Sequence, residues 1–169
     1  MIGTRDHRDF FVRRTMFEPQ RILLASHGTP GACAAERAAL ALCGSGRALF
    51  HLVVVPDFWK GMMGDDWLNN VATRDAYCKH VEAQLGKEIE EQRQALEPQV
   101  TARGTRYQIA VVIGKPAECL LGFAAEVSPD LVVIGSPRPP GAPGVRSRMR
   151  LEQLLKTLAA PLLIVPYPR

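Results

Sequence analysis

The strongest constraint on the fold is a short run, Leu131–Ile134, that is apolar at every position and ends at Gly135. A strand that is apolar on both faces needs cover on both faces, which is typical of a central strand in a parallel sheet. A second such run, Leu162–Val165, follows a helical pattern and Pro161, and we expect it to be buried as well. The pattern therefore predicts an α/β domain with its sheet in the middle.

The rest of the chain alternates between strand and helix patterns. Strands are expected at 21–26, 49–55 and 107–113, and helices at 30–43, 71–96, 117–127 and 151–158. This alternation, with right-handed crossovers, predicts a doubly wound sheet of five parallel strands with helices on both faces.

Three local signals refine these elements. Thr29 is a good N-cap residue and Pro30 suits the first helical position, so the first helix should begin there. Pro98 is expected to end the long helix. In the last helix, the apolar face is expected to contain Leu151, Leu154, Leu155 and Leu158.

The domain is expected to span residues 21–169, and 169 residues suit one core. Residues 1–20 are polar, mixed in charge and without a period, so we interpret them as a disordered or loosely attached N-terminal arm. The stretch 56–70 is expected to be a loop over the carboxyl edge of the sheet; a lid over a pocket is the alternative.

Composition bears on location and on classes of partner. The amino end lacks the apolar block of a secretory signal, so a cytoplasmic location is expected. No apolar stretch is long enough to span a bilayer, so no membrane partner is expected. The net charge of +4 is modest, and its pattern does not favour nucleic acid as a partner.

Motifs for catalysis and metal binding are missing from the sequence. There are no paired carboxylates at a strand end and no G-x-S-x-G motif. The four cysteines have no spacing typical of zinc ligands, so we interpret them as reduced and packed: Cys33, Cys43, Cys78 and Cys119. We therefore expect neither an enzyme nor a metal site.

Three stretches resemble, in order, motifs of the universal stress protein family: Val112–Pro116, Asp130–Ser136 and Ala160–Pro166. In that family, a V-x-x-G-x-P turn precedes the third helix, a D-L-I-V-x-G-S strand follows it, and a C-P-V-L-V-V strand ends the domain. The resemblance runs from Arg21 to Pro166. It implies the strand order 3-2-1-4-5 and a homodimer formed by pairing of the last strands, here Leu162–Val165.

The resemblance also implies a place for ATP, but the residues there differ. Members that bind ATP have G-x2-G-x9-G-[S/T] after the fourth strand, where glycines let backbone amides approach the phosphates. Gly135 matches the first glycine, Arg138 replaces the second, and Arg148-Met149 replaces the final pair. His27 stands where ATP binders tend to have Asp. We therefore expect no cofactor and no ATP bound in the family's manner.

The arginines keep a second hypothesis open. A guanidinium can replace amide donors to phosphate, so Arg138 and Arg148 would hold a phosphate-bearing ligand such as AMP, ATP, a cyclic nucleotide or an inorganic anion. The candidate pocket for such a ligand consists of Ala25, His27, Gly28, Thr29, Val55, Ile113, Gly114, Gly135, Ser136, Arg138, Arg148 and Met149.

The sequence thus leaves two functions to compare. The first is a universal stress-type regulatory dimer in the stress response, which acts by binding partners, with the loop Arg138–Arg150 as a surface for a protein partner. The second is a nucleotide- or phosphate-binding sensor of the same fold. Fold alone does not choose between them.

Overall fold

The computed structural model describes residues 17–26, 29–56, 71–141 and 149–168, and of residues 56 and 71–82 the backbone alone. Strands and helices alternate through these residues. The elements are β1 (Arg21–Ala25), α1 (Pro30–Leu42), β2 (Ala48–Pro56), α2 (Val71–Thr101), β3 (Arg106–Gly114), α3 (Pro116–Val127), β4 (Leu131–Gly135), α4 (Leu151–Thr157) and β5 (Leu162–Val165).

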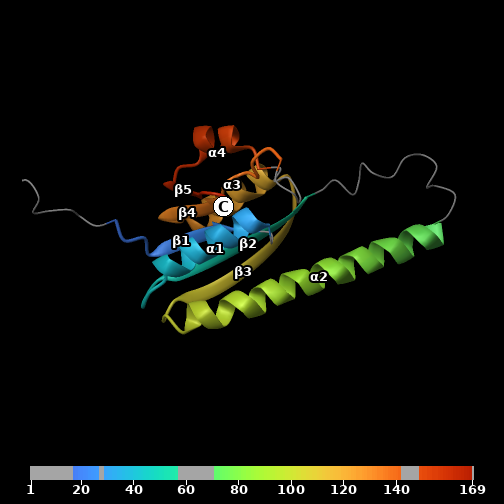
Figure 1. Cartoon of the computed structure of the whole chain (residues 1–169), viewed down its shortest axis with the longest axis horizontal. Coiled ribbons are helices and arrows are strands. Elements are labelled where there is room, and N and C mark those ends of the chain that lie inside the picture. The colour runs from blue at the N-terminus through green and yellow to red at the C-terminus, as the bar shows by residue number, and fades with distance from the viewer. Residues whose placement is uncertain (1–16, 27–28, 57–70, 142–148, 169) are drawn as a thin grey trace, which may run out of the picture.

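The strands form one parallel sheet in the order β3-β2-β1-β4-β5. Helices α1 and α2 cover one face, and α3 and α4 cover the other (Figure 1). This confirms the predicted doubly wound α/β fold and the strand order that the family resemblance implies. The connection after β1 leads to β2 on one side, and the connection after β4 leads to β5 on the other, so the carboxyl ends of β1 and β4 form the switch point of the sheet.

The central strands β1 and β4 carry the core. Ile22, Leu23, Leu24, Val132 and Val133 have no exposed surface. Successive residues point to opposite faces of a strand, so each strand contributes to both cores, one under α1 and α2 and the other under α3 and α4. Full burial of such a side chain stabilises the fold by about 1.5–3 kcal/mol.

Asp130 fixes the amino ends of β1 and β4. Its Oδ2 accepts hydrogen bonds from the backbone N–H groups of Gln20 and Arg21, both at 2.9 Å, and its own N–H donates to the Arg21 carbonyl at 2.8 Å. Pro19, just before, is fully buried. Residues 17–20 thus contact the domain, whereas residues 1–16 and 57–70 lie outside the described residues, so the arm and the loop stay predictions.

The prediction that Pro98 ends the long helix is wrong, because α2 continues to Thr101. Leu96 and Val100, on either side of the proline, are buried against the sheet at 3% and 0% exposure. The backbone N–H of Ala102 still donates to the Pro98 carbonyl at 3.0 Å. Packing of these two side chains therefore offsets the hydrogen bond that proline cannot make.

Two predictions of burial near the carboxyl end are also wrong. Leu154 is fully buried, but Leu155 is 69% exposed, because neighbours on a helix differ by about 100° in direction. Strand β5 is only partly buried, and its Leu163 is 38% exposed. The reason is position: β5 is an edge strand with one neighbour, β4.

His51 is a polar side chain in the core of the sheet. It is fully buried in β2, and its Nδ1 lies 2.7 Å from the hydroxyl oxygen of Tyr107 in β3. Among the described residues its Nε2 has no hydrogen-bond partner. Burial lowers the pKa of His51 from 6.5 to about 4, so the ring is neutral at pH 7.

We expect His51 to make the fold sensitive to acid. The unfolded chain takes up a proton near pH 6.5, whereas the folded chain does so only near pH 4, so stability falls as pH drops between these values. The loss at pH 4 relative to pH 7 should be on the order of 3 kcal/mol. Urea unfolding across this range should show a weaker pH dependence for His51→Gln, and equal dependence for both proteins would contradict the assignment.

Candidate functional site

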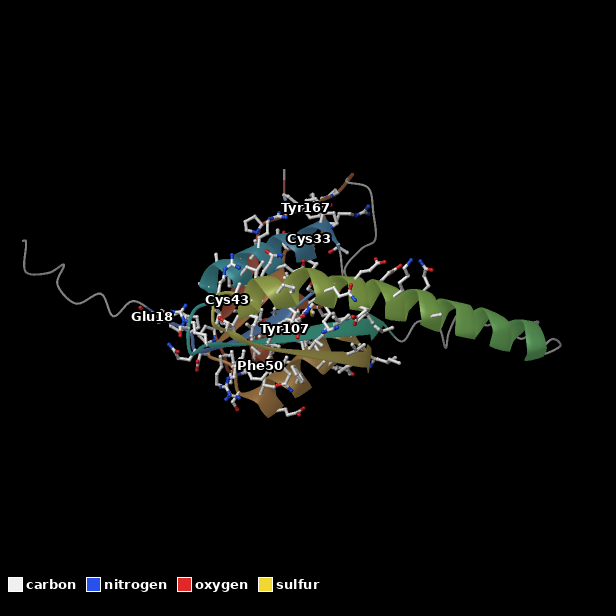
Figure 2. The ribbon with its side chains drawn as sticks, turned by 90° about the horizontal axis from the view of Figure 1, so that it is seen from below. Glu18, Cys33, Cys43, Phe50, Tyr107 and Tyr167 are labelled. Atoms are coloured by element: carbon white, nitrogen blue, oxygen red, sulfur yellow. The ribbon has the colours of Figure 1, made fainter. Side chains whose placement is uncertain are left out.

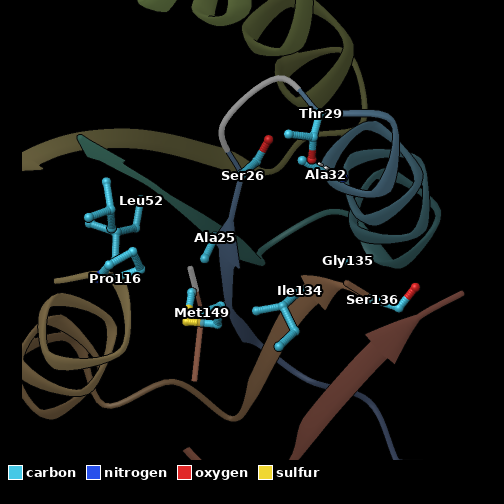
Figure 3. Close-up of a pocket in the computed structure, with 11 residues that line it drawn as sticks. Ala25, Ser26, Thr29, Ala32, Leu52, Pro116, Ile134, Gly135, Ser136 and Met149 are labelled. Atoms are coloured by element: carbon cyan, nitrogen blue, oxygen red, sulfur yellow. Dashed lines mark hydrogen bonds between the residues drawn. The ribbon is translucent and has the colours of Figure 1, made fainter. Parts of the chain in front are cut away.

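A small cavity lies at the carboxyl ends of β1, β2 and β4, at the switch point of the sheet (Figure 3). Its volume is about 50 Å³. Most of its lining is apolar, with hydroxyls on one side: Ala25, Ser26, Thr29, Ala32, Leu52, Val54, Pro116, Ile134, Gly135, Ser136 and Met149. Ligand pockets for drug-sized molecules are typically about 300–1,000 Å³, so this cavity has room for water or a small anion.

The start of α1 forms one wall of the cavity. Thr29 Oγ1 accepts a hydrogen bond from the Ala32 backbone N–H at 3.2 Å, and Pro30 opens the helix, as the sequence predicts. The hydroxyl thereby satisfies one of the free N–H groups at the helix start. The partial positive charge of the helix start faces the cavity, and part of it is already used by the cap.

Gly135 also lines the cavity and lies directly against the start of α1. A Cβ added at Gly135 would lie 2.2 Å from the Gly31 carbonyl oxygen and 2.4 Å from its carbonyl carbon. A Cβ added at Gly31 would lie 2.8 Å from the Ser136 carbonyl oxygen. Both contacts involve backbone, which cannot swing aside, so the end of β4 and the start of α1 need glycine at both positions.

A polar cluster lies behind the cavity, on the side of α1 and α2. The Ser26 hydroxyl donates to Glu36 of α1, and Gln92 Nε2 of α2 donates to Ser26 Oγ at 3.3 Å and to Glu36 Oε1 at 3.1 Å. In Figure 3 the Ser26 hydroxyl points toward the start of α1 and away from Met149. Burial raises the pKa of Glu36 above its usual value of 4.5.

This cluster affects which ligands suit the cavity. Ser26 is 2% exposed, and its hydroxyl hydrogen is used by the Glu36 carboxylate. It can therefore accept a hydrogen bond from a ligand but cannot donate one. A carboxylate just behind it opposes the approach of a phosphate.

Five of the residues predicted for the site line the cavity together: Ala25, Thr29, Gly135, Ser136 and Met149. Val55 is buried in β2 and does not line it, because Leu52 and Val54 occupy that face of the strand. His27, Gly28 and Arg148 lie outside the described residues.

The other predicted residues lie away from the cavity. Ile113 is 71% exposed near the end of β3, and neither it nor Gly114 belongs to the lining. Arg138, half-buried beyond β4, is also not part of the lining.

Sequence reasoning missed six lining residues: Ser26, Ala32, Leu52, Val54, Pro116 and Ile134. Ala32 lies one turn beyond Thr29, so the helical period signals it. Leu52 and Val54 share a face by strand alternation, and only the packing of α3 shows that this face is the one on the cavity.

Among the described residues, no three His, Cys, Asp or Glu side chains are grouped so that they could hold a metal ion. In the same part of the chain, no helix has the length and apolar character that a membrane crossing needs.

The fold and the switch-point cavity define a class, the doubly wound α/β domains. The model of the universal stress protein family matches residues 19–166. The chain therefore belongs to the universal stress protein family. No curated protein matches the chain at a significant level.

Solved structures of family members are similar in fold. UspA from Lactobacillus plantarum is 16% identical with a TM-score of 0.63, and the match covers 86% of this chain and 97% of that one. A member from Burkholderia pseudomallei is 23% identical with a TM-score of 0.59, covering 89% and 98%. A universal stress protein in complex with cAMP is 18% identical with a TM-score of 0.55, covering 89% and 99%.

We expect Gly135→Ala to destabilise the fold by about 1–3 kcal/mol, because the new methyl group would overlap the Gly31 backbone. Gly122→Ala is the matched control: Gly122 is an exposed residue inside α3, and nothing lies within 4 Å of an added Cβ. That variant should gain about 0.5–1 kcal/mol. Chemical unfolding measures both, and equal effects would contradict the role of the glycine contact.

Proposed function

We propose that this protein is a regulatory dimer of the stress response that acts by binding partner proteins, without catalysis. The observation that carries the proposal is the cavity at the switch point, with a volume of about 50 Å³ and a largely apolar lining. At the position where family members that bind ATP have a glycine-rich phosphate loop, this chain has Gly135 and then arginines.

The proposal excludes ATP bound in the family's manner, and the packing of Gly135 supports this. The close contact with Gly31 is a sufficient structural reason for a glycine at this position without any phosphate. Near the cavity, Glu36 adds a carboxylate and Ser26 adds a hydrogen-bond acceptor, and neither is a donor for phosphate. The loop Arg138–Arg150 then serves as a basic surface for an acidic protein partner.

The edge strand β5 is the proposed dimer interface, as the family resemblance implies. In the described residues its outer side has no neighbouring strand. Leu163 is 38% exposed on this strand, and Leu155 is 69% exposed on the adjacent α4. Pairing of two β5 strands would satisfy the free backbone groups and remove these leucines from water.

We expect Leu163→Asp to convert the dimer into a monomer, because it places a charge in the paired apolar edge. Sedimentation velocity measures the change. Ile113→Asp is the matched control: it adds the same charge to an exposed apolar residue on the opposite edge strand, and should leave the dimer intact. An unchanged dimer in Leu163→Asp would show that the interface lies elsewhere.

A phosphate- or nucleotide-binding sensor is the second candidate function. It is supported by the similarity to a universal stress protein whose structure is in complex with cAMP. In this function Arg138 and Arg148 would replace the missing glycines as phosphate donors. Met149, the residue after Arg148, lines the cavity, so a ligand as large as a nucleotide would have to move this side chain.

Thermal-shift titration with ATP, AMP, cAMP and inorganic phosphate distinguishes the two functions. A ligand at about 100 times its Kd stabilises by about 2.7 kcal/mol, which is about 5–10 °C for a chain of this size. We expect no shift with ATP. Adenosine, which lacks a phosphate, is the control ligand. A shift with AMP or cAMP but not with adenosine would instead support the sensor, provided that Arg138→Ala and Arg148→Ala remove this shift.

A further inference from the structure

The outer side of β3 is the longest free edge of the sheet. The strand has nine residues, Arg106–Gly114, and pairs with β2 along its whole length, from Ala48 opposite Arg106 to Pro56 opposite Gly114. No other strand of the described chain lies beside it. Its outward backbone N–H and C=O groups are therefore open to another strand.

The sequence of β3 lacks the usual protection of an edge. Natural edge strands are short, or carry lysine, proline or inward charges that prevent pairing. Here the only charge is Arg106 at the first position, proline is absent, and glycine occurs only at the last position. The other edge, β5, has four residues and is followed by Pro166.

Apolar side chains extend along this edge. Val111 is 48% exposed and Ile113 is 71% exposed, and both lie on the side of the sheet that Tyr107 shares with α2. The cause is the direction of α2: its first half projects past the sheet (Figure 1), and among its described side chains the buried ones are Leu96 and Val100. Two apolar side chains next to open backbone groups are a surface for an apolar strand.

The amino end of the β3 edge has charged residues, unlike the apolar end with Val111 and Ile113. A shallow groove of about 730 Å³ lies there, lined by residues of β1, β2, β3 and the end of α2, with Arg106, Tyr107 and Glu97 among them. Figure 2 views this side of the molecule, with Tyr107 toward α2 and Phe50 on the opposite side of the strands. Arg106 is exposed and has no ion pair within the described residues.

We propose that the β3 edge, Arg106–Gly114, binds an extended apolar segment of a partner protein as a sixth strand, with an acidic residue of that segment beside Arg106. Backbone hydrogen bonds along the edge supply affinity, and contacts with Val111 and Ile113 select alternating apolar side chains. This surface is distinct from β5 and from the loop Arg138–Arg150.

A second copy of this chain is a less suitable occupant. Pairing about a twofold axis at β5 closes a dimer, but a further twofold pairing at β3 would join dimers into an open chain without closure. This step rests on the proposed β5 dimer. A strand from a different protein satisfies the same backbone groups and ends the sheet.

The test uses the full chain and a fluorescein-labelled peptide of two glutamates followed by six residues that alternate between valine and threonine. Two control peptides carry N-methyl groups on one or the other set of alternate backbone amides. In an added strand only one set donates to the edge. We expect one methylated peptide to bind at least about tenfold more weakly in fluorescence anisotropy, and the other to bind like the parent.

Variants of the protein locate the peptide. Ile113→Lys should weaken binding at least about tenfold, while Leu163→Lys, the same change on the opposite edge, should leave it unchanged. Hydrogen exchange should slow in 106–114 on binding and stay constant in 162–165. Thermal melting of both variants checks that they are folded.

Three outcomes would overturn the proposal. The first is a failed peptide test. Either the parent peptide does not bind, or both methylated peptides bind equally, and equal binding would indicate non-specific adsorption. The second is equal loss in Ile113→Lys and Leu163→Lys. The third is a protein that stays dimeric in Leu163→Asp but becomes monomeric in Ile113→Asp, since a second copy would then occupy the edge. A monomeric wild type with normal peptide binding would overturn the β5 dimer only.

Discussion

The contact between Gly31 and Gly135 sets the geometry of the switch point. Backbone touches backbone there, so the start of α1 lies directly against the end of β4. Both elements line the cavity, so this contact fixes one side of it. Any ligand or partner at this end of the sheet therefore meets a wall that side-chain rotation cannot move.

Two-sided burial of β1 and β4 supports this contact. Their side chains pack under α1 on one face and under α3 and α4 on the other, and Asp130 holds their amino ends together. Most of the core is apolar, but His51 and Tyr107 meet in it under α2, and Ser26 and Thr105 are also buried. The His51 ring is neutral there, and it lowers the stability of the fold only at acidic pH, where the unfolded chain takes up a proton.

The edges of the sheet differ, and the difference suggests a division of roles. The β5 edge is short and lies beside α4, which suits pairing with an identical strand. The β3 edge is longer and is flanked by the half of α2 that leaves the sheet. In a family whose members share one fold, such differences at the edges allow different partners without change in the core.

The sequence alone determined the fold, because its signals are local. Apolar runs such as Leu131–Ile134, the Thr29 cap and the ordered family motifs each depend on neighbours in the chain. Even so, Pro98 and Leu155 show the limit of local signals: packing on the sheet continues a helix past proline, and a seven-residue helix buries only one side.

Only the tertiary structure decided the site. It brings Ser26, Glu36 and Gln92 together from three separate segments of the chain, places Val54 rather than Val55 at the cavity, and leaves Ile113 exposed at an edge. The physical reason is that each of these facts depends on which face of a strand meets which helix. Chain order fixes the alternation of side chains, and only packing between distant segments fixes the side that is covered.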